Sequence, residues 1–191
     1  MLAAPFFIAA GLLVVSGVGK LVRPAGAASA LRSAGLPGGP LAARALGLVE
    51  VAAGAAALWR PGPGTAAAVG VLYLGFAAFL VRLLRLGGAT SCGCVGAADA
   101  PPSRLHVALD LVAAAVAAAV AVWPVPSVAS AVAGSPLAGV TLVIGLVGAG
   151  ALLAVAVVEV PRAWRSYRPA HDEHSVRIRG PRPISLVERP R

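Results

Sequence analysis

Two cysteines separated by a single glycine, Cys92-Gly93-Cys94, are the residues of this chain best suited to chemistry. They lie in the polar, turn-rich stretch "TSCGCVGAADAPPSR", and the chain has no other cysteine. Cα atoms of residues i and i+2 are roughly 5.5 to 7 Å apart, near the range that a disulfide spans, and the glycine lets the backbone bend. A ring this small is strained and easily reopened, whereas a structural disulfide joins distant segments. If the pair is oxidised, we therefore expect it to be redox-active.

Two other interpretations of the cysteine pair stay open. In the first, the residues are unrelated thiols at a helix end. In the second, the two thiolates and His106 hold a soft metal such as copper(I) or zinc. No fourth ligand is evident in the sequence, so we predict neither a metal nor an organic cofactor.

Charged residues inside apolar segments are the second set of candidates. Glu50 and Asp110 both stand well inside such segments, where a carboxylate is costly unless it is paired or functional. Lys20 is the natural partner for Glu50, and Arg82 for Asp110. In one interpretation these pairs only fix how the helices pack. In the other, a carboxylate or His106 moves protons for thiol exchange, because the attacking species in that exchange is a thiolate.

The composition predicts that the elements holding these residues are membrane helices. Of the 191 residues, 59% are hydrophobic and only 12% are charged, and the mean hydropathy is +0.88. Soluble domains carry about 25% charged residues. Lipid is therefore the expected solvent, and every spanning segment must be helical because unpaired backbone is too costly in hydrocarbon.

Five segments are long enough to span a bilayer, which takes roughly 20 residues. They cover approximately residues 3–22, 41–59, 65–84, 103–123 and 137–160. The predicted fold class is all-α: an integral membrane protein with a four-helix antiparallel transmembrane bundle plus a fifth C-terminal transmembrane helix. Three regions follow: a four-helix domain over 1–123, the extra helix and its preceding loop over 124–160, and a basic, disordered tail over 161–191.

The antiparallel order brings the candidate residues together. The end of the first segment, the start of the second, the end of the third and the start of the fourth share one membrane face. Lys20, Glu50, Arg82, Asp110 and the cysteine loop all fall in that half of the bundle.

The basic residues predict the orientation of the bundle. The formal net charge is +9, and the arginines concentrate in two loops and the tail, a pattern typical of membrane topology rather than of nucleic-acid binding. The positive-inside rule then places the N-terminus outside, and the C-terminus and the cysteine loop in the cytoplasm. The absence of Asn and Gln and the single Lys suggest a GC-rich bacterial genome, so we expect a multi-pass protein of a bacterial plasma membrane.

Four stretches of the sequence resemble the MauE/DoxX-like family of small redox-associated membrane proteins. They are "SGVGKLVRP…LRSAGLP", "LGLVEVAAG", "SCGCVG" and "LHVALDLV", and the resemblance covers roughly residues 1–123. Position by position, it carries the family's motif onto Lys20, Glu50, Cys92, Gly93, Cys94 and Gly96. The chain departs from the family at Leu109-Asp110, where members often have Arg-Asn, and in its added fifth helix and tail.

The resemblance implies help in forming disulfides in a partner protein, as in methylamine utilisation. It favours an extracytoplasmic client, whereas the charge rule places the cysteines inside, and we keep the charge-based orientation. The function predicted is thiol–disulfide assistance to a thioredoxin-like or disulfide-containing partner, as an accessory protein that resembles an oxidoreductase. The rivals are a non-redox role, either a small transporter component or a helix-bundle subunit, and soft-metal handling.

Overall fold

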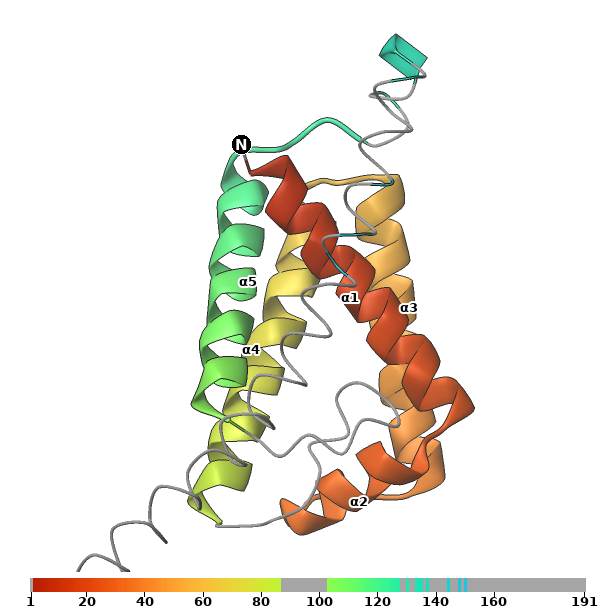
Figure 1. Ribbon diagram of the computed structural model, residues 1–191, viewed down its shortest axis with the longest axis vertical. Coiled ribbons are helices and arrows are strands. Elements are labelled where there is room, and N and C mark those ends of the chain that lie inside the picture. The colour runs from red at the N-terminus through yellow and green to blue at the C-terminus, as the bar shows by residue number, and fades with distance from the viewer. Residues whose placement is uncertain are drawn as a thin grey trace, which may run out of the picture.

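The structure is a computed structural model that describes residues 2–86, residues 103–127 and isolated positions between 130 and 150. These residues form a bundle of helices, and within them no strand occurs. Figure 1 labels the helices α1 (Ala3–Val22), α2 (Ala25–Ser33), α3 (Pro40–Trp59), α4 (Pro63–Arg85) and α5 (Arg104–Val122). All except α2 are long and apolar enough to cross a membrane. The described part of the chain is all-helical and has the helix lengths and composition of a membrane protein.

The helix boundaries follow from local sequence signals. Pro40 and Pro63 each open a helix directly after an extended glycine, a position where proline's missing N–H is no loss. Ser103 caps α5 by accepting a hydrogen bond from the backbone N–H of His106. The four predicted segments of the first 123 residues agree with α1, α3, α4 and α5 to within two residues at each end.

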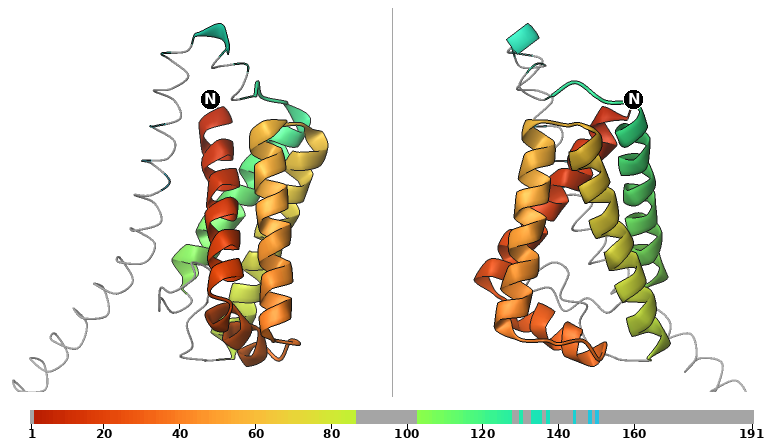
Figure 2. Two further views of the ribbon diagram at one scale, coloured as in Figure 1. Left: turned by 90° about the vertical axis from the view of Figure 1, so that its right-hand side faces the viewer. Right: turned by 180° about the vertical axis from the view of Figure 1, so that it is seen from behind.

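Helix α2 was not predicted, because the sequence between the first two spanning segments reads as a loop. It lies across the end of the bundle, against the start of α3 (Figures 1 and 2). Its small buried face, which includes Ala27 and Ala28, packs against Ala43 of α3. The helix ends at Ser33 and is followed by Gly35, whose φ is +70°. The Leu36 N–H returns to the Leu31 carbonyl, the Schellman arrangement that favours glycine.

The spanning helices alternate in direction and pack as two neighbouring pairs. α1 lies mainly along α3, and α4 lies along α5. The ends of α1 and α4, the starts of α3 and α5, and α2 therefore lie at one end of the bundle (Figure 1). We call this end the arginine face, because it carries exposed arginines: Arg23, Arg32, Arg44, Arg82, Arg85 and Arg104.

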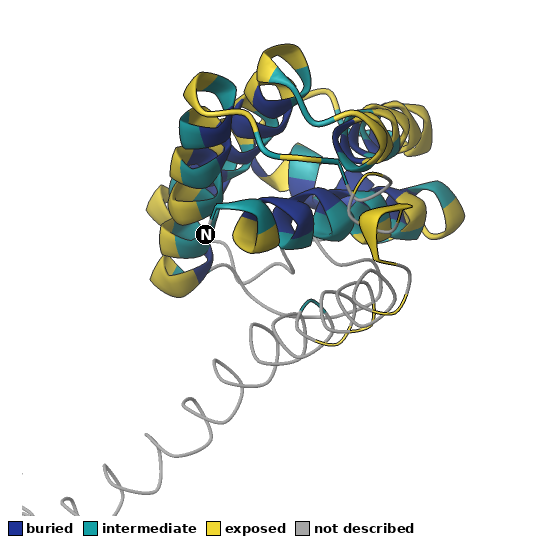
Figure 3. Ribbon diagram, turned by 90° about the horizontal axis from the view of Figure 1, so that it is seen from above, coloured by how far each residue is buried: buried dark blue, intermediate teal, exposed yellow. Residues whose placement is uncertain are grey.

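The outward surfaces of the helices are apolar, as expected of a protein solvated by lipid. Large exposed side chains include Leu48 of α3, Val71 of α4 and Leu111 of α5, and Figure 3 shows buried positions facing inward and exposed positions facing outward around the bundle. Trp59 and Trp123 are exposed where α3 and α5 end, opposite the arginine face. Membrane-interface tryptophans occupy such positions.

The predicted fifth transmembrane helix falls almost entirely outside the described residues, as does the basic tail from 161 onward. Both stay predictions.

Candidate functional site

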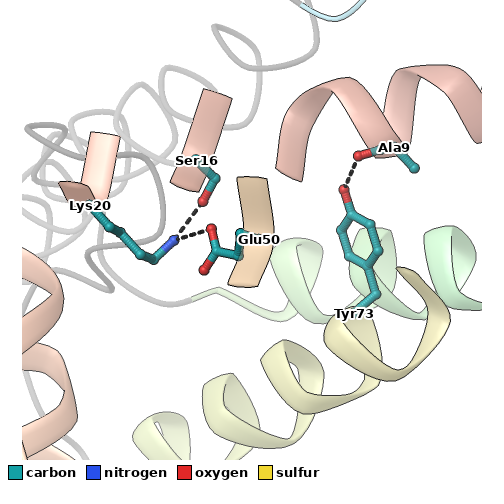
Figure 4. A network of polar contacts seen from close by, with 5 residues as sticks. All are labelled: Ala9, Ser16, Lys20, Glu50 and Tyr73. Carbon is teal, nitrogen blue, oxygen red and sulfur yellow. Dashed lines mark hydrogen bonds and ion pairs between the residues drawn. The ribbon is translucent and has the colours of Figure 1, made fainter. Parts of the chain in front are cut away.

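An ion pair between Lys20 of α1 and Glu50 of α3 lies inside the bundle, as the sequence predicts. The Lys20 Nζ atom is 2.8 Å from Glu50 Oε2, and the two side chains are 5% and 0% exposed. Lys20 Nζ also donates to Ser16 Oγ at 2.6 Å, one turn earlier on α1 (Figure 4). A charge buried this fully is tolerated only with such partners.

The pair lies deep relative to the arginine face. Glu50 stands ten residues after Pro40, about 15 Å along the helix at 1.5 Å per residue. Lys20 belongs to the last turn of α1, and its long side chain reaches inward to the carboxylate (Figure 4). The Phe76 ring of α4 lies 5.5 Å from Lys20 Nζ, measured to the ring centroid, so the ammonium also has an aromatic face beside it.

Glycines bring α1 and α3 close enough for the pair to form. A Cβ placed on Gly47 would lie 2.7 Å from the Gly17 carbonyl oxygen and 3.0 Å from Lys20 Cβ. A Cβ on Gly54 would lie 2.6 Å from the carbonyl oxygen of Ala10. Small residues at such contacts are how membrane helices approach closely. Gly47 and Gly54 flank Glu50 on α3, so the seam that they form fixes the carboxylate against α1.

Tyr73 links α4 to α1 at the same level of the bundle. Its hydroxyl donates to the Ala9 carbonyl oxygen at 2.8 Å (Figure 4), and its ring meets Phe76 edge-to-face with centroids 6.1 Å apart. The carboxylates of Glu50 and Asp110 lie near enough to act electrostatically on the Tyr73 hydroxyl. Each spanning helix thus contributes one ionisable side chain to this region.

One oxygen of Glu50 has no hydrogen-bond partner among the described residues. Oε2 accepts from Lys20, whereas Oε1 is buried and accepts from none of them. A buried polar atom left unsatisfied costs free energy, and native structures contain few of them. The carboxylate can therefore take a further proton or hydrogen-bond donor.

His106 is buried at the start of α5, with 7% of its surface exposed. Its Nδ1 atom lies 2.6 Å from Ser103 Oγ, and Ser103 Oγ also accepts from the His106 backbone N–H at 3.3 Å. The serine therefore holds both the helix start and the imidazole ring. Whichever of Oγ and Nδ1 carries the shared proton decides whether the other ring nitrogen donates or accepts.

The predicted Arg82–Asp110 pair stays a prediction. Within the described residues, the Arg82 Nε donates to the Ala34 carbonyl oxygen at the C-terminal end of α2. That carbonyl belongs to a helix end, where carbonyls have no intrahelical partner and attract cations. Asp110 is half-buried on α5. Helix α2 thus supplies Arg82 with an acceptor that the sequence did not reveal.

Cys92, Gly93, Cys94 and Gly96 lie outside the described residues. The structure does fix the two helix ends that residues 87–102 connect. α4 ends at Arg85 and α5 begins at Arg104, both at the arginine face. His106 lies one turn from that connection.

Sequence reasoning did not anticipate Ser16, Tyr73 or Phe76 as members of the site. Ser16 had a usable signal, because residues i and i+4 of a helix are neighbours and Ser16 is four residues before Lys20. Tyr73 and Phe76 carried no such signal, since a tyrosine or phenylalanine in an apolar segment is equally suited to face lipid.

Comparison with known proteins gives one match. A family model described as methylamine utilisation protein MauE matches residues 1–124, the span that contains every described helix of the bundle. No curated protein and no solved structure in the comparisons matches the chain.

Proposed function

The chain belongs to the methylamine utilisation protein MauE family, and we propose that it assists thiol–disulfide exchange in a partner protein through Cys92 and Cys94. The single observation that carries the proposal is the spacing of these two cysteines, the only ones in the chain. They stand on a segment whose flanking helix ends both lie at the arginine face. Support also comes from the family resemblance, which carries the cysteine motif onto these positions.

The exchange proceeds through a mixed disulfide. A thiolate of the partner attacks one sulfur of the oxidised Cys92–Cys94 pair and releases the other as a thiolate. The partner's second thiolate then resolves the mixed disulfide, so the partner gains a disulfide and Cys92 and Cys94 become a dithiol. A second, more oxidising disulfide protein of the thioredoxin-like class restores the pair. His106 follows the cysteine pair closely in sequence, and its imidazole accepts protons from the two thiols and returns them.

The proposed setting is a bacterial plasma membrane. There the protein spans the bilayer with its N-terminus outside and its C-terminus in the cytoplasm, and a fifth spanning helix follows the four spanning helices that the structure describes. The arginine face then meets the cytoplasm, where anionic lipid headgroups attract basic residues.

The test is to express Cys92→Ser, Cys94→Ser and the double variant, quench cells in acid, alkylate free thiols and run non-reducing gels. Each single variant should lose function as completely as the double one, because one thiol cannot complete a two-electron cycle. A single variant that keeps the cysteine able to form the mixed disulfide should also trap it with the exchange partner, which identifies that partner. Ser91→Ala is the matched control, since it alters the adjacent side chain and leaves both thiols.

Two results would count against the redox role. One is a wild-type pair that is reduced under all growth conditions, and the other is normal maturation of the client with all three variants. Metal bound stoichiometrically to the purified wild-type protein and absent from the double variant would favour soft-metal handling instead.

A further inference from the structure

The polar interior of the bundle is confined to the half next to the arginine face. Among the described residues, the buried acidic and basic side chains are Lys20, Glu50 and His106. Lys20 lies in the last turn of α1, and His106 in the first turn of α5. Glu50 stands at the middle of α3, where this polar half ends.

The other half of the interior is apolar. The cluster that fills it comes from the first part of α1, the end of α3, the start of α4 and the end of α5. Its members include Phe6, Leu13, Ala57, Val69, Ala117 and Val120. No side chain in this cluster ionises except Tyr73 at its inner edge, whose hydroxyl is engaged with the Ala9 carbonyl. Protons crossing such a layer would have no carrier.

Glu50 is placed where these two halves meet, and its free oxygen is the atom able to accept a proton. Oε1 accepts no hydrogen bond within the described part of the chain. Lys20 on α1 is the ion-pair partner of Glu50, and the carboxylates of Glu50 and of Asp110 on α5 both act electrostatically on the Tyr73 hydroxyl of α4.

We propose that Glu50 is an intramembrane proton-binding site that exchanges protons with the solution at the arginine face and not at the opposite face. The proton adds to Oε1 and converts the carboxylate to a carboxylic acid, with no other bond made or broken. The Lys20 ammonium keeps its other contacts, because Ser16 Oγ still accepts from its Nζ and the Phe76 ring still lies beside it. The site does not depend on the thiol function of Cys92 and Cys94.

The first experiment detects the proton. Purified full-length protein in lipid nanodiscs is studied by infrared difference spectroscopy over a pH titration. The wild type should show the carbonyl stretch of a protonated carboxyl group that grows as pH falls and shifts in D₂O, and Glu50→Gln should lose it. Asp110→Asn is the matched control and should keep it. If no wild-type band titrates while the protein stays folded, or if the band survives in Glu50→Gln, the proposal is wrong.

A second variant covers the case in which Glu50→Gln does not fold. Lys20→Met keeps the carboxyl group and removes the cation that favours its ionised form, so the band should extend to higher pH than in the wild type. A band with unchanged pH dependence would place the protonated group elsewhere and overturn the assignment.

The third experiment tests the sidedness. Protein with Cys92→Ser, Cys94→Ser and Ser33→Cys is reconstituted in sealed vesicles, because Ser33 is exposed on α2 at the arginine face. An impermeant maleimide then reports which fraction has that face outward. After an external pH jump, the Glu50 band should change at once in this fraction. In the protein molecules with the arginine face toward the vesicle interior, it should change only after a proton ionophore is added. A prompt response from both orientations would contradict one-sided access.

Discussion

Gly17 of α1 and Gly47 of α3 face each other so closely that a Cβ on Gly17 would lie 2.5 Å from the Gly47 carbonyl oxygen, and one on Gly47 would lie 2.7 Å from the Gly17 carbonyl oxygen. Backbone, not a flexible side chain, occupies the space on both sides. The same crossing places Lys20 beside Glu50. The ion pair and the helix seam are therefore one structural unit.

Gly47→Ala should separate α1 from α3 and weaken the bundle. Inserting a methyl group into a packed contact typically costs about 1 to 3 kcal/mol, and here the neighbouring atoms are backbone. The thermal midpoint of the purified protein in detergent should fall. Gly11→Ala on α1 and Gly75→Ala on α4 are controls, because a Cβ at either position meets nothing within 4 Å. Equal midpoints for Gly47→Ala and the controls would contradict the seam.

Removing one member of the buried ion pair should be worse than removing both. Lys20→Met leaves the Glu50 carboxylate buried without its counter-charge, a loss of about 3 to 5 kcal/mol for buried pairs. The double variant Lys20→Met/Glu50→Leu leaves no charge behind and should recover part of that loss. Unfolding free energies of both single variants and the double variant form a cycle that measures the coupling. Additive effects would show that the two residues do not interact.

Tyr73→Phe tests the link between the two helix pairs. The substitution keeps the ring contact with Phe76 and removes the hydrogen bond from the Tyr73 hydroxyl to the Ala9 carbonyl oxygen. A hydrogen bond of this kind contributes about 0.5 to 1.5 kcal/mol. Stability should fall by that amount, as measured by denaturant titration. A drop in hydrogen-exchange protection confined to α1 and α4 would locate the effect.

Ser103→Ala should loosen the start of α5. The serine hydroxyl caps the helix and contacts His106 Nδ1, and loss of an N-cap costs about 0.5 to 2 kcal/mol. Ser103→Asp or Ser103→Asn should restore the cap. Hydrogen exchange at the first turn of α5 reports the effect, and unchanged protection in Ser103→Ala would contradict the capping role.

The spanning helices and the Lys20–Glu50 pair were predictable from sequence for physical reasons. About 20 apolar residues in lipid have no alternative to a helix. Once the segments alternate in direction, the end of α1 and the first half of α3 must share a membrane half. An unpaired charge in that half is costly, so two opposite charges there are expected to pair.

Helix α2 and the contact of Arg82 could not be predicted, because both depend on short-range features that leave little trace in the hydrophobic pattern of the sequence. Helix α2 has nine residues and buries alanines, so no apolar periodicity marks it, although "AGLP" contains the glycine and proline that follow a helix end. Arg82 could be assigned to a membrane face from sequence, but not to a neighbour. Its contact with Ala34 depends on how α4 is rotated and on α2 lying within reach.

The orientation of the bundle is the last prediction. The exposed arginines gather at one end of the bundle, whereas Arg60 stands at the other end, directly after α3. The positive-inside rule therefore places the arginine face in the cytoplasm.

In a Cys92→Ser/Cys94→Ser background, Ser130→Cys lies beyond the end of α5 and should react with an impermeant maleimide in intact cells. Ser33→Cys on α2 should react only after the cells are permeabilised. Both side chains are exposed in the structure, so a difference in labelling reports sidedness rather than burial. The reverse pattern would invert the bundle, and Glu50 would then exchange protons with the outside of the cell.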